Sequence, residues 1–282
     1  YLIDLATGDV LAVVTAMNPQ IQYGEDIMTR LTYAMSGGEH RENLHRSLVD
    51  GIREMLTDAC RKADTDQRYV YELVFVGNTV MHHFLLDLDP LPLTRSPFTP
   101  KNLEPRDLDS ANFGIGNPKG NLHVLPLVAG FVGADCVASI LATGAHKSDE
   151  PCFLIDIGTN TEIVVGDKDR MVACSCASGP AFEGAHIKHG MRAASGAIEG
   201  VWIDPDSLEP KLTTIDDIDP VGICGSGLID ALSEMLKSGI LDTSGKIRTE
   251  IDNPRIRRRD GVSEYCLLYT SPSPRDLSTS RM

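Results

Sequence analysis

The sequence predicts an α/β protein made of two related lobes whose sheets mix parallel and antiparallel strands. One observation is the order of its apolar segments, which runs hairpin, helix, strand, helix, strand, helix, and then three strands and a helix. Another is its size, because 282 residues with 42% hydrophobic side chains can bury two cores. Antiparallel hairpins that precede alternating helices and strands, twice over, favour two lobes with a ligand cleft between them.

The first series of elements begins with a hairpin. Residues 1–5 and 10–14 have the pattern of strands and flank a turn at 6–9. The elements that follow are helices at 25–33, 43–61, 80–86 and 133–143 and strands at 71–76 and 122–125, assigned from apolar spacing and β-branched runs. Residues 90–120 are rich in Pro, Asn and Gly, so we expect a long connection there.

The second series starts at residue 152. Three strands are expected, at 152–157, 162–165 and 171–176. Residues 178–200 form a glycine-rich stretch, and a helix is expected at 225–236 with Gly239 as its C-cap.

Both ends of the chain differ from the rest. Tyr1 already lies within a strand pattern, so we expect a preceding strand to be missing. Residues 267–282 show no periodicity, and ten of the sixteen are Ser, Thr, Pro or Arg. A natural tail would explain this stretch, but residues 268–276 also resemble translated sequencing-adaptor sequence of the kind found in metagenomic reading frames. We favour the second explanation and expect the chain to be a fragment.

Composition excludes several classes of function. The formal charge of −14 argues against nucleic-acid or anionic-membrane partners, since both are themselves negative. The chain lacks a run of about 20 uncharged apolar residues, so a membrane span is not expected. The seven cysteines are scattered without a paired C-x-x-C set, which indicates reduced thiols in a cytoplasmic protein and neither a zinc ribbon nor an iron–sulfur site.

An acid followed by a Gly-Thr turn is the sharpest motif. The apolar strand at 153–155 ends in Asp156, and the turn after it offers amide and hydroxyl donors suited to phosphate. The candidate phosphate-binding residues are Gly158, Thr159, Asn160 and Thr161. Asp156 could hold Mg²⁺ through water. An ordinary hairpin with polar turn residues explains the same pattern equally well.

A second motif opens the helix at 225–236 with three glycines. Unpaired N–H groups and the helix dipole make such an N-terminus a candidate nucleotide site. Its members are Gly222, Gly225, Ser226 and Gly227. It is neither a Walker A loop nor a Rossmann fingerprint, and close helix packing is an equally good explanation.

Two further segments carry polar groups. Asp135 opens a helix of small apolar residues, where it either caps the N-terminus or serves as a catalytic carboxylate that orients water or metal. The loop at 178–184 follows a strand and contains Ser178 and Glu183, which suits functional contacts, although solvated loop residues are more frequent.

Together these motifs resemble those of a known ATPase superfamily. The Asp156 turn resembles the second phosphate loop of the actin, Hsp70 and sugar-kinase superfamily, and Asp135 resembles the catalytic Asp of its carbohydrate-kinase branch. The stretches 18–24, 76–83, 126–135, 178–184 and 222–228 are similar to the ATPase region of the reductive activators of corrinoid proteins. The resemblance covers roughly residues 1–245, and the co-occurrence is more specific than any one motif.

The resemblance implies a two-lobed actin-like, RNase H-like ATPase fold and an ATP-driven electron-transfer helper. Such proteins couple ATP binding and hydrolysis, with Mg²⁺, to re-reduction of cob(II)alamin in a partner. That partner is a corrinoid iron–sulfur protein or a corrinoid methyltransferase protein, and the electron comes from an upstream ferredoxin-like [2Fe–2S] domain. It also implies that Ser178 and Glu183 face the corrinoid partner. A homodimer is considered as the oligomeric state.

Departures from the family pattern set the expected boundaries. Residues 1–148 are expected to be a first ATPase lobe with a connecting insertion, without its first strand and phosphate-1 loop. Residues 149–254 are expected to start the second lobe, and 255–282 to be a tail outside the family, artefactual from about 267. Two alternatives stay open: a sugar-kinase-type phosphotransferase with Asp135 as base, and a non-catalytic actin-like scaffold or sensor.

Overall fold

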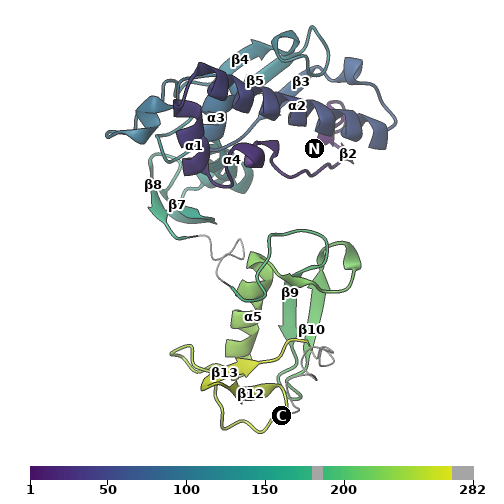
Figure 1. The fold of residues 1–282 in the computed structure, drawn as a ribbon, viewed down its shortest axis with the longest axis vertical. Helices are drawn as coiled ribbons and strands as arrows, with labels where there is room; N and C mark the ends of the chain where they lie inside the picture. The colour runs from purple at the N-terminus through teal and green to yellow at the C-terminus, as the bar shows by residue number, and fades with distance from the viewer. Residues whose placement is uncertain (180–186, 269–282) are drawn as a thin grey trace. The chain divides into compact units, whose positions relative to one another are not determined.

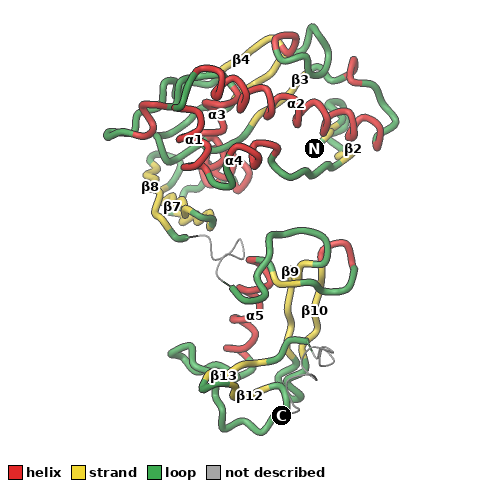
Figure 2. The backbone as a smooth tube through the Cα atoms, viewed as in Figure 1, coloured by secondary structure: helices red, strands yellow, loops and turns green. Residues whose placement is uncertain are grey.

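The computed structural model describes residues 1–179 and 187–268 (Figure 1). Internal contacts divide them into two compact units, 1–157 with 161–176, and 158–160 with the residues from 177 onward. Parallel and antiparallel pairing both occur, together with helices, which confirms the predicted α/β class with mixed sheets (Figure 2). The division assigns strands 152–157 and 171–176 to the first unit, whereas the sequence assigned them to the second lobe. The lobe boundary at 148/149 stays a prediction.

The central sheet of the first unit has the strand order β3-β5-β4. It consists of β3 (Glu72–Phe75), β5 (Asn121–Val124) and β4 (Arg106–Asp109), with β3 parallel and β4 antiparallel to β5. Strand β4 lies inside the predicted long connection. Its residues are Arg-Asp-Leu-Asp and only Leu108 is even partly buried, so hydrophobic alternation gave no signal.

Four α-helices accompany this sheet. They are α1 (Ile27–Met35), α2 (Gly38–Lys62), α3 (Thr79–Leu85) and α4 (Ala134–Thr143). Helices α1, α2 and α3 share with the sheet a core that includes Leu44, Phe84, Leu85 and Val124, each with no exposed surface. Helix α4 packs in two other apolar clusters, one with Leu125 and one with Val164. Helix α2 begins five residues before the predicted start, with Gly37 as its N-cap.

Short elements complete the unit. The predicted hairpin is present as β1 (Leu2–Ile3) and β2 (Val10–Ala12). Its 3-10 helices are η1 (Pro19–Tyr23), η2 (Gln67–Tyr69), η3 (Leu91–Thr94), η4 (Ser110–Asn112) and η5 (Ala145–Lys147).

A second three-stranded sheet carries the residues of greatest interest. It consists of β6 (Cys152–Ile157), β7 (Asn160–Gly166) and β8 (Met171–Ala177), with β7 in the middle. Leu154 and Val164 pack with Cys136 of α4 in one apolar cluster. Because side chains alternate along a strand, Asp156 and Glu162 lie on the same face as Leu154 and Val164, toward α4.

The second unit is organised around strand β9 (Ala197–Ile203). It pairs antiparallel with β10 (Pro210–Thr214) and parallel with β11 (Gly222–Ile223), and α5 (Gly225–Lys237) packs against it (Figures 1 and 2). The 3-10 helix η6 (Ile215–Asp217) follows β10. The predicted helix at 225–236 is confirmed, and Gly239 adopts a left-handed φ of 75° just after it.

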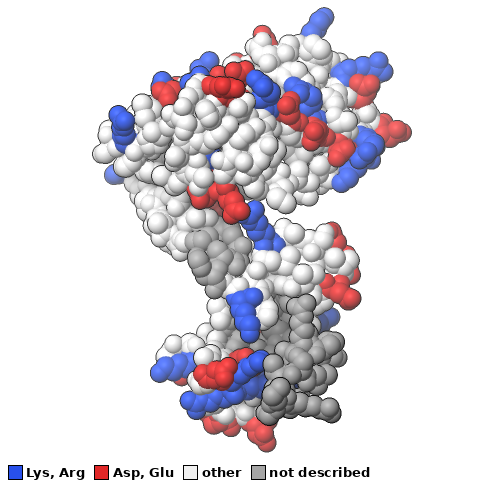
Figure 3. Space-filling view, in the orientation of Figure 1, with Lys and Arg blue, Asp and Glu red and all other residues white. Residues whose placement is uncertain are grey.

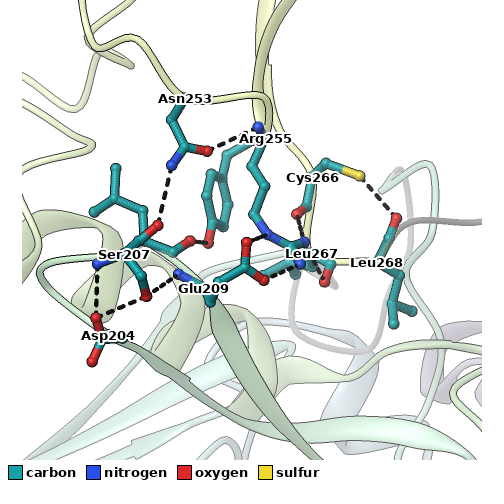
Figure 4. Close-up of polar contacts among 10 residues, drawn as sticks. Asp204, Ser207, Glu209, Asn253, Arg255, Cys266, Leu267 and Leu268 are labelled. Carbon is teal, nitrogen blue, oxygen red and sulfur yellow. Dashed lines mark hydrogen bonds and ion pairs between the residues drawn. The ribbon is translucent and has the colours of Figure 1, made fainter.

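A hairpin that the sequence did not predict closes the described part of the second unit. It is formed by β12 (Ile256–Arg259) and β13 (Val262–Tyr265). Arg255, only 7% exposed, donates to Glu209 (Nε–Oε1 2.9 Å) and to the carbonyl oxygen of Cys266 (2.8 Å), as Figure 4 shows. Residues 255–268 are therefore folded against this unit, although no helix or strand was predicted for them.

Charges of both signs are interspersed over the face shown in Figure 3, without a continuous basic surface in that view. None of the helices in the described ranges is long and apolar enough to cross a membrane.

Candidate functional site

Asp135 lies in the first turn of α4 and is half-buried. Its Oδ1 accepts from the amide of Cys136 at 2.9 Å, while Gly133 occupies the N-cap position and supplies no side-chain bond. Asp135 is thus the second residue of α4 and not its N-cap, although its carboxylate does satisfy one amide of the first turn.

Asp156 and an unpredicted acid, Glu162, approach the same region from the sheet. The two residues are direct partners in the antiparallel pairing of β6 and β7. Ser175 of β8 donates a hydrogen bond of 2.8 Å from its Oγ to Oε1 of Glu162. The three strands thereby hold two carboxylates on the face that packs against α4.

The three carboxylates interact electrostatically. Burial raises the pKa of Asp135, and the negative charge of Asp156 raises it further. Burial likewise raises the pKa of Glu162, with contributions from Asp135 and Asp156. Burial, and then the charge of Asp135, raises the pKa of the neighbouring Cys136 thiol to about 11, so this thiol stays protonated at neutral pH. A cluster of like charges that perturb one another is typical of sites that bind a cation or move a proton.

The turn after Asp156 is tight. The amide of Gly158 donates to the carbonyl oxygen of Asn160 at 3.0 Å, and a Cβ at position 158 would lie 3.2 Å from that oxygen. Thr159 and Asn160 are exposed, whereas Thr161 is 8% exposed. Both residues of the exposed pair reach the solvent, and Thr161 is in large part packed within the sheet.

Ser178 lies beside this turn. The amides of Ser178 and Gly179 both donate to the carbonyl oxygen of Thr159, at 3.1 and 3.0 Å, and Ser178 is exposed. The structure thus brings Ser178 next to the predicted phosphate turn. Glu183, the other predicted partner-facing residue, lies outside the described residues.

The glycines at the N-terminus of α5 allow close packing. A Cβ on Gly227 would lie 2.2 Å from the carbonyl oxygen of Ile198, and one on Gly222 would lie 2.8 Å from Sδ of Met191. Gly225 is the first residue of the helix, and Ser226 is exposed in its first turn. Packing alone explains Gly222 and Gly227, while the nucleotide role of all four residues stays a prediction.

The carboxylates of this site suit a metal ion whose remaining ligands are water or phosphate oxygens. Across the described ranges, no three His, Cys, Asp or Glu side chains are grouped to hold a metal ion by themselves. Mg²⁺ usually keeps several waters and takes one or two carboxylates plus phosphate oxygens, so Asp156 beside the predicted phosphate turn fits that ion.

Sequence reasoning missed Glu162 and Ser175. The available signal was symmetry about the turn, because Asp156 and Glu162 flank it at positions that a two-strand hairpin brings opposite each other. Ser175 would have required the register of β8, which a single sequence does not supply.

Comparison with known proteins divides the chain into two family regions. Residues 1–148 match the family described as the RACo middle region, and residues 150–279 match the C-terminal domain of RACo, the ASKHA domain. The chain is 34% identical over 267 residues to the corrinoid activation enzyme RamQ of Eubacterium limosum, covering 94% of this chain and 44% of that protein. It is 29% identical over 291 residues to the [Co(II) methylated amine-specific corrinoid protein] reductase of Methanosarcina barkeri, covering 87% of this chain and 50% of that protein.

A solved structure is also similar. It is described as a reductive activator for corrinoid, iron-sulfur protein, with a TM-score of 0.78, 40% identity, and coverage of 94% of this chain and 42% of that one. This match and the ASKHA description confirm the predicted actin-like fold class. The chain spans half or less of the length of each of these proteins.

Proposed function

Since the chain belongs to the RACo family, we propose that it forms part of an ATP-dependent reductive activator of corrinoid proteins. The observation that carries the proposal is the convergence of Asp135 from α4 and Asp156 from β6 on one face of a sheet, next to the tight turn at 158–160. These are the positions at which the family resemblance implies a catalytic carboxylate and a magnesium-binding carboxylate.

Each residue has a role in this proposal. Asp156 would hold Mg²⁺ through water, and the exposed Thr159 and Asn160 would donate to phosphate oxygens. Asp135 would orient the attacking water, a task suited to a half-buried carboxylate whose pKa is raised by burial. The N-terminal turn of α5, with exposed Ser226, would contact the nucleotide.

The hydrolysis of bound ATP would supply the free energy for an unfavourable electron transfer. Reduction of Co(II) to Co(I) is uphill for ordinary donors, so nucleotide-dependent changes in the affinity for the partner must offset the difference. The electron would come from a [2Fe–2S] domain, which we propose lies elsewhere in the full-length protein. Full-length here means a protein that spans the length of its relatives. The partner would be a corrinoid iron–sulfur protein or a corrinoid methyltransferase protein in the cytoplasm.

The partner-facing surface is proposed to include Ser178 and Glu183. Ser178 is exposed, and its amide is anchored to the phosphate turn through the carbonyl of Thr159. A nucleotide-dependent movement of that turn would therefore be transmitted to Ser178 directly.

The test measures how the full-length protein reduces a purified corrinoid protein. The change in cobalt absorbance monitors the reduction, with and without Mg-ATP. We expect Co(I) to form only when Mg-ATP is present. Equal reduction without nucleotide, or none with it, would count against the proposed coupling. A sugar substrate phosphorylated by the same preparation would favour the phosphotransferase alternative instead.

A further inference from the structure

The N-terminus of α3 and the segment leading into α4 are joined by backbone hydrogen bonds. The carbonyl oxygen of Gly77, in the short loop between β3 and α3, accepts from the amides of both Ala134 and Asp135, at 3.1 and 3.3 Å. These are the first two residues of α4. The backbone of Asp135 is therefore bonded to the segment before α3, whereas its side chain faces the sheet that contains Asp156.

A buried hydroxyl adds a second connection. Oγ1 of Thr79, which is 3% exposed, donates to the carbonyl oxygen of Ala129 at 2.9 Å. Ala129 in turn pairs with Val132 in an isolated bridge, with its amide donating to the Val132 carbonyl at 3.0 Å. Thr79 thus holds the tight turn from which the chain enters α4.

A close backbone approach is the third connection. A Cβ on Gly133 would lie 2.7 Å from Cα of Asn78 and 2.9 Å from the amide nitrogen of Thr79, besides 2.6 Å from Oδ1 of Asp135. The φ of Gly133 is −90°, which any residue adopts, so the requirement is for space and not for a special conformation. The obstructing atoms of Asn78 and Thr79 are backbone atoms and cannot rotate aside, whereas the Asp135 carboxylate would have to move.

We propose that Gly133 and Thr79 are positioning residues for Asp135. Through them the N-terminus of α3 fixes the first turn of α4, and hence the place of the Asp135 carboxylate relative to Asp156 on the sheet. The catalytic consequence rests on the proposed ATPase function, whereas the positioning itself is a property of the fold.

The first test introduces a methyl group at the close approach. Gly133→Ala in the full-length protein should speed amide hydrogen exchange at Ala134 and Asp135 by about tenfold or more, because their bonds to Gly77 lengthen. The kcat for ATP hydrolysis should fall between about 10- and 100-fold, with the Kd for ATP within about twofold of wild type. Gly38→Ala is the matched control, since a Cβ there meets nothing within 4 Å.

The second test guards against a Gly133→Ala protein that fails to fold. Thr79→Val keeps the side-chain shape and removes the hydroxyl, so kcat should fall about tenfold with exchange at Asp135 accelerated. Thr79→Ser restores the donor and should recover most of the kcat.

The outcomes separate the two proposals. Wild-type exchange at Ala134 and Asp135 in both Gly133→Ala and Thr79→Val would overturn the positioning, and so would equal losses of kcat and ATP affinity. A wild-type protein that neither binds nor hydrolyses ATP would overturn the proposed function, and the exchange comparison would still decide the positioning.

Discussion

Asp156 and Glu162 face each other across the hairpin of β6 and β7 as a direct cross-strand pair. Like charges placed opposite each other on a sheet destabilise it unless something else offsets the repulsion. A hydrogen bond from Ser175 stabilises only the Glu162 member, and the pKa of that group is still raised by burial and by its acidic neighbours. The arrangement is therefore one that the fold tolerates and that a bound cation would stabilise.

Removing the unpredicted member of this pair should stabilise the fold. A carboxylate whose pKa is raised in the folded state destabilises that state at neutral pH, so Glu162→Gln should raise Tm by roughly 2 °C. We expect ATP hydrolysis to fall at the same time, because the field around Asp135 changes. Thermal unfolding followed by circular dichroism checks the first part, with exposed Glu54→Gln as control. A lower Tm for Glu162→Gln than for wild type would contradict this account.

Acid should destabilise the first unit through His82. This side chain is 1% exposed, and both of its ring nitrogens lack a hydrogen-bond partner among the described residues. Burial, and then the nearby His83 and Arg106, lower the pKa of His82 to about 4. In the unfolded chain His82 takes up a proton below its ordinary pKa of 6.5, whereas in the folded protein it stays neutral down to about pH 4. The free energy of unfolding therefore falls between about pH 6.5 and 4, by about 3 kcal/mol in total.

His82→Leu should flatten this pH dependence. Urea unfolding at about pH 7 and about pH 4.5 measures it, and His146→Gln, at a partly exposed site, is the control. An equal loss of stability in His82→Leu and wild type would assign the acid sensitivity to other groups.

The second unit should depend on Arg255. Its side chain is 9% exposed, and the guanidinium donates both to Glu209 and to the chain beyond β13, so Arg255→Ala removes several bonds at once (Figure 4). We expect the free energy of unfolding of this unit to fall by about 2 kcal/mol. The ion pair contributes little to this figure, because the Glu209 side chain is 56% exposed. Trp202, the only tryptophan of the chain, lies on β9, so its fluorescence reports unfolding of this unit. Exposed Arg258→Ala should leave the transition unchanged.

Ser178 should matter more for the partner than for the nucleotide. Ser178→Ala keeps the amide that donates to Thr159 and removes only the exposed hydroxyl. We expect corrinoid reduction to slow about tenfold while the Kd for ATP changes less than about twofold. Equal losses of reduction and ATP affinity would assign Ser178 to the nucleotide site.

Much of the fold was predictable because its elements have clear periodicity. Helices α1, α4 and α5 and strands β6 and β8 lie within a few residues of the predicted ranges. Each helix presents an apolar face to a core, and the two strands contribute Leu154 and Met171 to another. Strand β4 and the β12–β13 hairpin were not predicted because their residues are mostly polar and exposed. Strand β9 was not predicted either, because it begins within the glycine-rich stretch and Glu199 and Gly200 interrupt its apolar run.

The site was predictable only in part, for a different reason. Asp135 and Asp156 stand out in sequence because each interrupts or ends an apolar segment. The hydrogen bond of Thr79 and the close approach of Gly133 each join positions about 50 residues apart in the sequence. Only the folded backbone shows that these positions are in contact.

We propose that Asp156 and the turn after it bind Mg-ATP. Isothermal titration of the full-length protein with Mg-ATP, for wild type and Asp156→Asn, tests it most directly. Replacing the carboxylate removes the charge that would hold the hydrated ion, so affinity for Mg-ATP should fall at least about tenfold while affinity for ATP in the presence of EDTA stays nearly unchanged. Wild-type Mg-ATP affinity and hydrolysis in Asp156→Asn would contradict the account.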